Sequence, residues 1–389
     1  MSVTQRHGVI PQQEFMEIED QKVALALSGT SAFKDVRVND FVISLRSFEG
    51  GIEHSRFAGC VSPAYTVLRP RCQIEPRYFA YAMKSVGFVS ELCSKSDGIR
   101  DGKTIRYEHF ASIELPVPSS LEQVSIVAFL DRETGTIDAL VAEQERLIAL
   151  LKEKRQALIS HAVTKGLDPN APMKDSGVAW FGTVPAHWAV TRLKHVSPMV
   201  TVGIVIEPAK LYRDEGVPAL RSLNVKPGRI QLDNVVRITE ESNELHRKSR
   251  LSAGDLVAVR TGQPGTTAVV PPALEGCNCV DLIVIRRPQA GDERFLCYYL
   301  GSDAAQFQVS GGAEGAIQQH FNVETAANLA LPWPSRSEQS RIVEFLDAEI
   351  AKLDELAEAA SITRSLLSER RSALISAAVT GKIDVRGLA

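Results

Sequence analysis

The chain has 389 residues, of which 44% are hydrophobic and 23% are charged, and its formal net charge is −3. This length predicts two or three globular domains. The near-neutral charge excludes a surface that is strongly basic all over, as in some nucleic-acid-binding proteins, but it is compatible with local basic faces. The longest apolar runs, such as Val23–Leu27, are far shorter than the ~18 residues of a membrane-spanning helix. Six cysteines without a CxxC pair fit a reducing compartment, so we expect a cytoplasmic protein without a signal peptide.

Residues 1–118 form the first predicted domain. Short alternating apolar runs, separated by Gly, Pro, Asn and Asp, predict strands near residues 41–45 and 64–68, and a helical stretch follows at 78–86. This mixture predicts an α+β globule. Basic and polar side chains on its loops are of the types that contact phosphates and base edges in DNA. The candidate DNA-binding residues of this globule are Arg6, His7, Arg46, Lys103 and Arg106.

Residues 119–168 predict one long central helix. Ser119 and Glu122 have the spacing of a capping box, which is typical of a helix N-terminus. Apolar residues then recur at intervals of three and four over several heptads, as in the seam of a coiled coil. Gly166, followed by Pro169, ends the pattern. The helix has about 43 residues and is therefore ~65 Å long.

Residues 169–334 form the second predicted globule, which is also α+β, with strands expected near 256–260 and 282–286 and a helix near 294–300. Two of its segments resemble segments of the first globule: DLVAVRTG (255–262) resembles DFVISLRS (40–47), and RFLCYYLGS (294–302) resembles RYFAYAMKS (77–85). Three polar loops stand out, at Arg221–Asn224, Arg260–Thr267 and Ala316–Asn322. In the second of them, Gln263 is suited to adenine. The candidate DNA-binding residues of this globule are Arg221, Ser222, Asn224, Arg260, Thr261, Gln263, Thr266, Gln318 and Gln319.

Residues 335–389 form a distal long helix with a tail, and this helix duplicates the central one. Residues 116–168 align without a gap on residues 332–384, with 25 identities in 53 positions. Self-similarity at a fixed interval indicates an internal duplication. The chain is therefore predicted to be α+β, with two globular domains alternating with two long helices.

Charge is segregated within each helix. Residues 122–145 contain six acidic residues and one basic residue, residues 146–165 contain one acidic and five basic residues, and the distal helix repeats the gradient. An antiparallel pair places the acidic start of each helix beside the basic end of the other, so we predict an antiparallel intramolecular coiled coil. Two separate amphipathic helices, each covering one globule, are the alternative. The predicted partner-binding residues are the seam residues Leu130, Ile137, Leu151, Leu346, Leu353 and Leu367.

The sequence contains no recognisable catalytic or cofactor motif. There is no GxGxxG loop, no Asn-Pro-Pro-aromatic tetrad and no obvious nucleophile triad. The spacing from Gly98 to Gly102 is one residue too short for a phosphate-binding loop, and Cys277-x-Cys279 has no second pair with zinc spacing. We therefore expect a non-catalytic chain that holds no metal and no cofactor of its own.

Three segments resemble the specificity subunits of type I restriction–modification systems: GCVSPAYTVLRP (59–70), SGVAWFGTVPAHWAVTRLKHV (176–196) and SALISAAVTGKIDVRG (372–387). The resemblance covers nearly the whole chain. It implies two target recognition domains, each reading one half of a bipartite double-stranded DNA site in the major groove. It also implies that the helices set the spacing and dock two modification methyltransferase subunits, and that restriction/translocase subunits join the complex. S-adenosylmethionine, ATP and magnesium are then expected in those partners.

The first globule departs from this pattern at its start. The segment AWFGTVPAHW begins at Ala179, near the start of the second globule. The duplication relates position 332 to position 116, and the same interval counted back from Ala179 places the counterpart of this segment before Met1. We therefore expect the first recognition domain to lack roughly its first forty residues. A misplaced start codon, a truncated gene and a split variant all remain open as explanations.

Two other functions stay open on the sequence alone. A coiled-coil adaptor whose globules bind proteins would show no salt-dependent association with DNA. A self-contained modification or cleavage enzyme would bind S-adenosylmethionine by itself. Because both globules are close to neutral, we expect tight DNA binding to require a partner that closes around the DNA.

Overall fold

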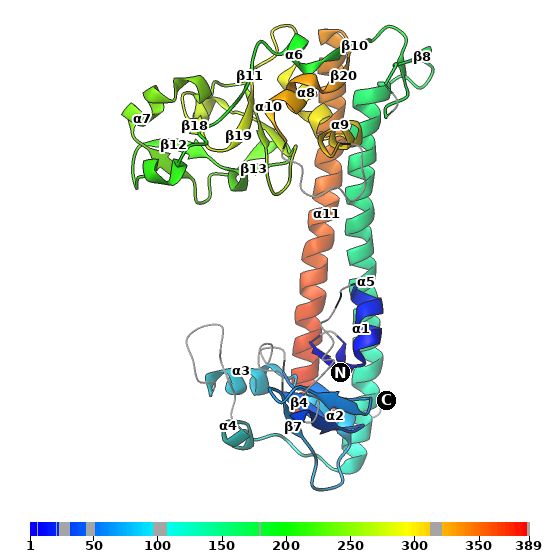
Figure 1. Cartoon of the computed structure of the whole chain (residues 1–389). Coiled ribbons are helices and arrows are strands. Elements are labelled where there is room, and N and C mark those ends of the chain that lie inside the picture. The colour runs from blue at the N-terminus through cyan, green and yellow to red at the C-terminus, as the bar shows by residue number, and fades with distance from the viewer. Residues whose placement is uncertain are drawn as a thin grey trace. The chain divides into compact units, whose positions relative to one another are not determined.

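The computed structural model describes residues 1–5, 7–20, 22, 32–43, 51–95, 107–178, 180–311 and 321–386. The chain forms two compact units (Figure 1): the first combines Met1–Leu147 with Ala359–Ala389, and the second is Ile148–Glu358. Each unit contains one globule and part of both long helices, α5 (Ser120–Lys165) and α11 (Arg336–Val379). Within the described residues, no helix is long and apolar enough to span a membrane. The predicted domain boundaries at 118, 168 and 334 stay a prediction, because the division into units falls inside the helices.

Both long helices begin at a capping box, the predicted one at Ser119 and Glu122 and its duplicate at Ser335 and Glu338. The Ser119 hydroxyl oxygen accepts a hydrogen bond from the backbone N–H of Glu122 at 3.4 Å, and the Glu122 carboxylate accepts one from the Ser119 N–H at 3.1 Å. The Ser335 hydroxyl oxygen accepts the Glu338 N–H at 3.3 Å in the same way. Gly166 follows α5 with φ +77°, a left-handed conformation that ends a helix at little cost only in glycine.

The long helices run antiparallel within the first unit. Arg371 Nε donates to Asp138 Oδ1 at 2.8 Å, and Arg364 Nη1 lies 3.9 Å from Glu145 Oε1. Moving seven residues forward along α5 therefore moves seven residues backward along α11. The predicted fold class, α+β with two long helices that pair as an antiparallel coiled coil, is confirmed.

The same ion pair occurs in the second unit. Arg155 Nε lies 3.4 Å from Asp354 Oδ1. In the gap-free alignment of the two helices, Asp354 is the duplicate of Asp138, and Arg371 is the duplicate of Arg155. The duplicated sequence thus makes one contact twice. Each pair is partly exposed, so it contributes at most about 1 kcal/mol and acts mainly on the orientation of the helices.

The predicted partner-binding residues lie on the seam between the two long helices. Leu130 packs with Ile375 and Ala378 of α11 in the first unit, and Leu346 packs with Ile159 of α5 in the second. Side chains on a heptad seam meet across the helix pair, so these residues stabilise the chain's own coiled coil and are covered. The exposed fractions are 0% for Leu130, 5% for Ile137, 8% for Leu151, 0% for Leu346 and 7% for Leu353, while Leu367 is half-buried.

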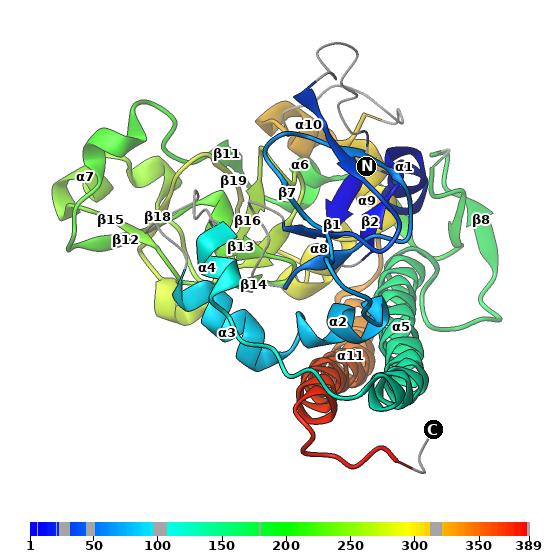
Figure 2. The same ribbon diagram turned by 90° about the horizontal axis from the view of Figure 1, so that it is seen from below.

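The first globule packs short strands against α2 and the helix pair. Its strands are β1 (Ser2–Thr4), β2 (Gly8–Ile10), β3 (Lys34–Val36), β4 (Phe41–Ile43), β5 (Glu53–His54), β6 (Gly59–Val61) and β7 (Thr66–Leu68). Its helices are α1 (Gln12–Glu19), α2 (Pro76–Ala82), α3 (Val86–Ser94) and α4 (Tyr107–Ala111). The strands β5, β4 and β7 form an antiparallel sheet in that order. Figure 2, which looks along the long helices, shows α2 beside α5 and α11, and apolar residues of all three share one core.

The second globule contains two main sheets. A four-stranded antiparallel sheet has the order β11-β19-β16-β17, and a smaller sheet has the order β15-β12-β18, in which β12 and β18 are parallel. The strands β16 and β19 are buried along their whole length, which explains why both read as continuous apolar runs. The helices α8, α9 and α10 pack with the ends of α5 and α11 in one core.

The remaining bounds in the second globule are as follows. The strands are β8 (Met173–Asp175), β9 (Thr183–Pro185), β10 (Ala189–Arg192), β11 (Val200–Val202), β12 (Val217–Leu220), β13 (Val225–Lys226), β14 (Arg229–Ile230), β15 (Val236–Ile238), β16 (Leu256–Val259), β17 (Thr267–Val269), β18 (Asn278–Cys279), β19 (Leu282–Ile285) and β20 (Ala330–Trp333). The helices are α6 (Leu193–Val196), α7 (Glu240–Leu245), α8 (Glu293–Leu300), α9 (Asp303–Val309) and α10 (Val323–Asn328), with short 3-10 turns between them.

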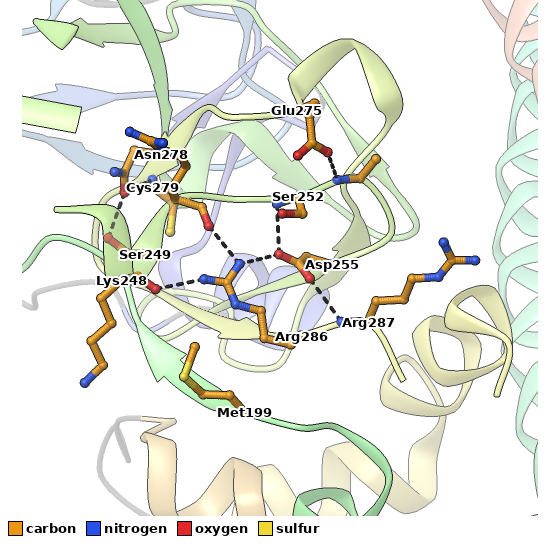
Figure 3. Close-up of polar contacts among 12 residues, drawn as sticks. Met199, Lys248, Ser249, Ser252, Asp255, Glu275, Asn278, Cys279, Arg286 and Arg287 are labelled. Carbon is orange, nitrogen blue, oxygen red and sulfur yellow. Dashed lines mark hydrogen bonds and ion pairs between the residues drawn. The ribbon is translucent and has the colours of Figure 1, made fainter. Parts of the chain in front are cut away.

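A buried aspartate–arginine pair supports the sheet of the second globule (Figure 3). Asp255 is 2% exposed; its carboxylate accepts the Arg286 guanidinium at 2.5 Å, the Ser252 N–H at 2.9 Å and the Arg287 N–H at 3.0 Å. Arg286 also donates to the backbone carbonyl of Lys248 at 2.8 Å. A buried charge is tolerated when its partner and hydrogen bonds replace the lost water, as they do here.

The first globule has the same pair in the equivalent place. Asp40, also 2% exposed, accepts two hydrogen bonds from Arg69, at 2.9 and 2.6 Å, and one from the Arg37 N–H at 2.8 Å. Each aspartate precedes a central strand, and each arginine follows the antiparallel neighbour of that strand. The two globules therefore share a framework.

We expect the first unit to lose stability in acid because of Asp40. Burial by itself raises the pKa of this carboxyl, but the hydrogen bonds from Arg69 and Arg37 outweigh burial and hold the pKa below its ordinary value of 3.8. Such a group contributes stability above its unfolded pKa and loses that contribution as the pH falls through the folded pKa. Urea unfolding should therefore show a decrease in the free energy of unfolding below about pH 4. The Asp40→Asn variant should lack this part of the decrease, and an identical pH profile in wild type and variant would contradict the assignment.

Candidate nucleic-acid interface

The loop between β16 and β17 carries four of the predicted DNA-binding residues. The Gly265 N–H donates to the Val259 carbonyl at 2.9 Å, which closes the loop into a tight turn. Gly262 and Gly265 have φ angles of +91° and +83°, a conformation that favours glycine. The loop tip, Thr261 to Gln263, is exposed, whereas Arg260 and Thr266 are half-buried. The two exposed polar side chains are thus presented to solvent on a short, closed turn.

Asn224 has a structural role that the sequence did not reveal. Its side chain is 0% exposed. Its Oδ1 accepts the Arg221 N–H at 2.9 Å, and its Nδ2 donates to the Gln231 and Asp233 carbonyls at 2.9 and 3.1 Å. Because the side chain is buried and both its amide N–H groups and its oxygen have partners within the chain, Asn224 stabilises the turn after β12. We therefore remove Asn224 from the predicted base contacts, whereas its neighbour Ser222 is exposed.

The two arginines of the candidate interface are held in place. Arg221 donates to the Asn234 carbonyl at 2.7 Å, and its guanidinium lies 5.9 Å from the centre of the Tyr212 ring. Arg260 donates to the Asp281 carboxylate at 2.5 Å. Such contacts fix the direction of a guanidinium group before a ligand arrives. In this state Arg260 has only its remaining N–H groups to offer to DNA.

Two of the predicted loops, Arg221–Asn224 and Arg260–Thr267, meet at one edge of the second globule together with Phe321, near the end of the third. The Val280 N–H donates to the Leu220 carbonyl at 2.7 Å, immediately before the first loop. The next residue, Asp281, pairs with Arg260 of the second loop. The Phe321 N–H, at the end of the third loop, donates to the Arg260 carbonyl at 3.2 Å. Segments far apart in the sequence therefore meet around one link between the two sheets.

Sequence reasoning missed the apolar residues at this edge. Ile204 pairs with Val280, and after it come Val205, which is 47% exposed, and Ile206, which is 78% exposed. Leu223, between the predicted Ser222 and Asn224, is 66% exposed. Exposed aliphatic groups next to polar loops are suited to contact thymine methyl groups. The sequence signal is weak, because an apolar run such as residues 202–206 reads as a buried strand.

The remaining predicted residues are less informative. His7, in the first unit, is half-buried, and its Nε2 lies 2.7 Å from Glu19 Oε1. An intramolecular partner therefore already occupies the imidazole. The residues Arg6, Arg46, Lys103, Arg106, Gln318 and Gln319 lie outside the described residues.

The described residues contain no group of three His, Cys, Asp or Glu side chains that could hold a metal ion. Cys277 and Cys279, which the sequence singled out, are both buried at β18. Burial raises the pKa of the Cys277 thiol to about 12 and raises that of Cys279 further. Both thiols lie among apolar side chains of one core cluster, so we describe them as core residues.

Comparison with known proteins identifies the relatives of the chain. No family model matches it. The MjaVIII type I restriction enzyme specificity subunit of Methanocaldococcus jannaschii is 23% identical over 322 residues, covering 80% of this chain and 71% of that protein. The EcoBI specificity subunit of Escherichia coli is 22% identical over 346 residues, covering 84% and 71%. Type I restriction specificity subunits are relatives of this chain.

A solved structure shares the fold. A chain from a structural study of the assembly and conformational transition of a type I R-M system superposes with a TM-score of 0.69 and 16% identity, covering 89% of this chain and 83% of that one. The similarity of fold therefore extends over most of the chain and includes both globules.

Proposed function

We propose that this chain is the DNA sequence-recognition subunit of a type I restriction–modification complex. Each globule, as a target recognition domain, reads one half of a bipartite target. The names of the relatives support this role. The observation that carries the proposal is that the polar loops Arg221–Asn224 and Arg260–Thr267 meet at one edge of the second globule, around Val280 and Asp281. The relatives give no support to the adaptor interpretation.

The recognition residues in this proposal are either exposed or half-buried with only part of their hydrogen-bonding groups used within the chain. In the second globule they are Arg221, Ser222, Arg260, Thr261, Gln263 and Thr266, joined by the exposed apolar residues Ile206 and Leu223. Polar side chains of these types read base edges and phosphates. The nearly neutral globules cannot displace many counterions from the DNA phosphates by themselves, so the affinity for DNA rises when partners complete the complex.

The proposal assigns the chemistry to other subunits. This chain is non-catalytic, two modification methyltransferase subunits dock on it, and restriction/translocase subunits complete the assembly. S-adenosylmethionine, ATP and magnesium bind in those partners. The complex acts on DNA in the cytoplasm.

A methylation map tests this function. The chain would be expressed with its cognate modification methyltransferase in a host without DNA methylation, and modified adenines would be located by sequencing. We expect one bipartite asymmetric motif with a fixed spacer, because two different globules read two different halves. A symmetric motif would mean that only the second globule reads DNA and would contradict the role given to the first. A complex that forms and leaves the genome unmodified, or a failure of the two proteins to associate, would overturn the proposed function.

A further inference from the structure

The second globule is attached to the distal helix at two points. Immediately before α8, the Asp292 N–H donates to Gln339 Oε1 at 2.8 Å. Within α8, Arg294 and Tyr298 lie one turn apart and both bind the carboxylate of Asp347, the arginine at 2.5 Å and the tyrosine hydroxyl at 2.7 Å. Gln339 is fully buried, and its amide is the bridge between the start of α8 and the start of α11.

A third attachment reaches the central helix. At the start of α9 the Asp303 N–H donates to Ser160 Oγ at 3.0 Å. Gln156, one turn earlier on α5, donates to the Asp303 carboxylate at 2.7 Å and to the Gly301 carbonyl at 2.9 Å. The segment from Asp292 to Asp303 is therefore bound to both long helices.

The first globule repeats the first two attachments, one immediately before α2 and one within α2. The Glu75 N–H, immediately before α2, donates to Gln123 Oε1 at 3.2 Å. Arg77 Nη2 lies 2.6 Å from the Asp131 carboxylate, and the Tyr81 hydroxyl donates to the same carboxylate at 2.8 Å. In the gap-free alignment of the two helices, Gln123 and Asp131 are the duplicates of Gln339 and Asp347.

The third attachment is repeated as well. At the start of α3 the Val86 N–H donates to Ser376 Oγ at 2.9 Å, and Ser376 is the duplicate of Ser160. In the globules, Val86 corresponds to Asp303. The interval between these two residues is one position longer than the interval between Ser160 and Ser376. One residue was therefore gained or lost between the globule and the helix. The contacts were nevertheless kept in both copies. The sequences that follow the central strands differ instead, RTGQPGTT in one globule and LRSFEGG in the other.

Three contacts that do not lie on one line, made to two helices, remove the rotational freedom of a globule. Two contacts would leave an axis about which it could turn. The second globule also packs on the ends of α5 and α11 through a shared apolar core. Apolar packing is not directional, whereas a hydrogen bond depends on its angle, so the polar contacts of α8 and α9 add a defined direction to this packing.

We propose that these contacts form a mount, defined as Gln339, Asp347 and Ser160 with their partners in the second unit and Gln123, Asp131 and Ser376 with theirs in the first. The mount holds each recognition domain at one angle on the helices and thereby makes the complex accept a single spacer between the two half-sites. The inference rests on the proposed function. The mount residues are positioning residues, because they lie on the helix side of the globule and act on the target through its orientation.

The test measures which spacer lengths are methylated. The Asp347→Ala/Ser160→Ala double variant removes two of the three points in the second unit. The milder Tyr298→Phe variant removes one hydrogen bond and keeps the ring in place. We expect both to recognise the same two half-site sequences as wild type. Methylation at spacers one base pair longer or shorter should rise about tenfold, the change expected from losing one charge-assisted hydrogen bond.

Asp354→Ala is the matched control. It removes a partly exposed aspartate on the same helix, one heptad after Asp347, which pairs with Arg155 between the helices and does not touch the globule. We expect this variant to keep the single spacer. Thermal unfolding would establish that each variant is folded, and if the double variant is not, Tyr298→Phe decides the outcome.

The results separate the two proposals. A wild-type complex without a bipartite motif removes the proposed function and, with it, the role of the mount. A wild-type complex with one spacer, together with Tyr298→Phe and double variants that keep that spacer, overturns the mount alone. Loss of the second half-site sequence in these variants also overturns it, because the contacts would then serve folding or reading rather than orientation.

Discussion

Replacing Thr261 and Gln263 by alanine is expected to weaken recognition of the half-site read by the second globule strongly and to leave the fold intact. Both side chains are exposed at the tip of the loop between β16 and β17, so their loss removes little packing. Each good contact to a base edge contributes about 1–3 kcal/mol of discrimination. The double variant should therefore lower the single-turnover methylation rate on the mapped target by roughly 30-fold or more, since about 2 kcal/mol corresponds to that factor.

The control for this loss lies on the same globule. Glu241 is exposed on α7, and the neighbouring Asn243 donates to the Gly276 carbonyl at 3.1 Å, next to the start of β18. The candidate interface lies at the other end of β18, so Glu241→Ala should methylate at the wild-type rate. An unchanged rate in the Thr261/Gln263 double variant would remove this loop from the interface. A lowered melting temperature in that variant would assign the effect to folding instead.

Replacing Asp255 by alanine is expected to destabilise the second unit strongly. The change leaves the Arg286 guanidinium, whose side chain is 18% exposed, without its carboxylate, and it leaves the Ser252 and Arg287 N–H groups without an acceptor. Breaking a buried pair from one side costs about 3–5 kcal/mol, because the remaining charge stays desolvated. Urea unfolding measures this as a loss of free energy of unfolding.

A surface ion pair in the same unit supplies the comparison. Glu244 pairs with Arg250 and its side chain is 61% exposed. Exposed pairs contribute about 0–1 kcal/mol, so Glu244→Ala should unfold within about 1 kcal/mol of wild type. If Asp255→Ala costs no more than Glu244→Ala, the buried pair does not support the sheet in the way the structure indicates.

The long helices could be predicted because their determinants are local. The capping boxes at Ser119 and Ser335 act over three residues, and the heptad pattern joins residues three and four apart. The separation of charge along each helix predicted the antiparallel pairing, and the Asp138–Arg371 pair agrees with it. The α+β character of the globules was visible for the same reason, since alternation and turn residues are properties of short segments.

The reading surface required the tertiary structure. Asn224 has the composition of a base-reading residue, and only the return of the chain at residues 231–233 shows that its amide is occupied. The pairing of Arg260 with Asp281 depends on the register of β16 against β19. Register is set by how two strands pack, and a single segment does not encode it.

The sequence by itself determined the two long helices, their duplication, their antiparallel charge pattern and the class of the two globules. The tertiary structure alone decided which seam residues are internal, which loops meet at one edge, and that Ser160 meets the N–H of Asp303 across 143 positions of the chain. The physical reason is the distance along the sequence over which each kind of interaction acts. Helix propensity, capping and periodicity act between near neighbours, whereas a binding edge or a mount is made by hydrogen bonds between segments that only folding brings together.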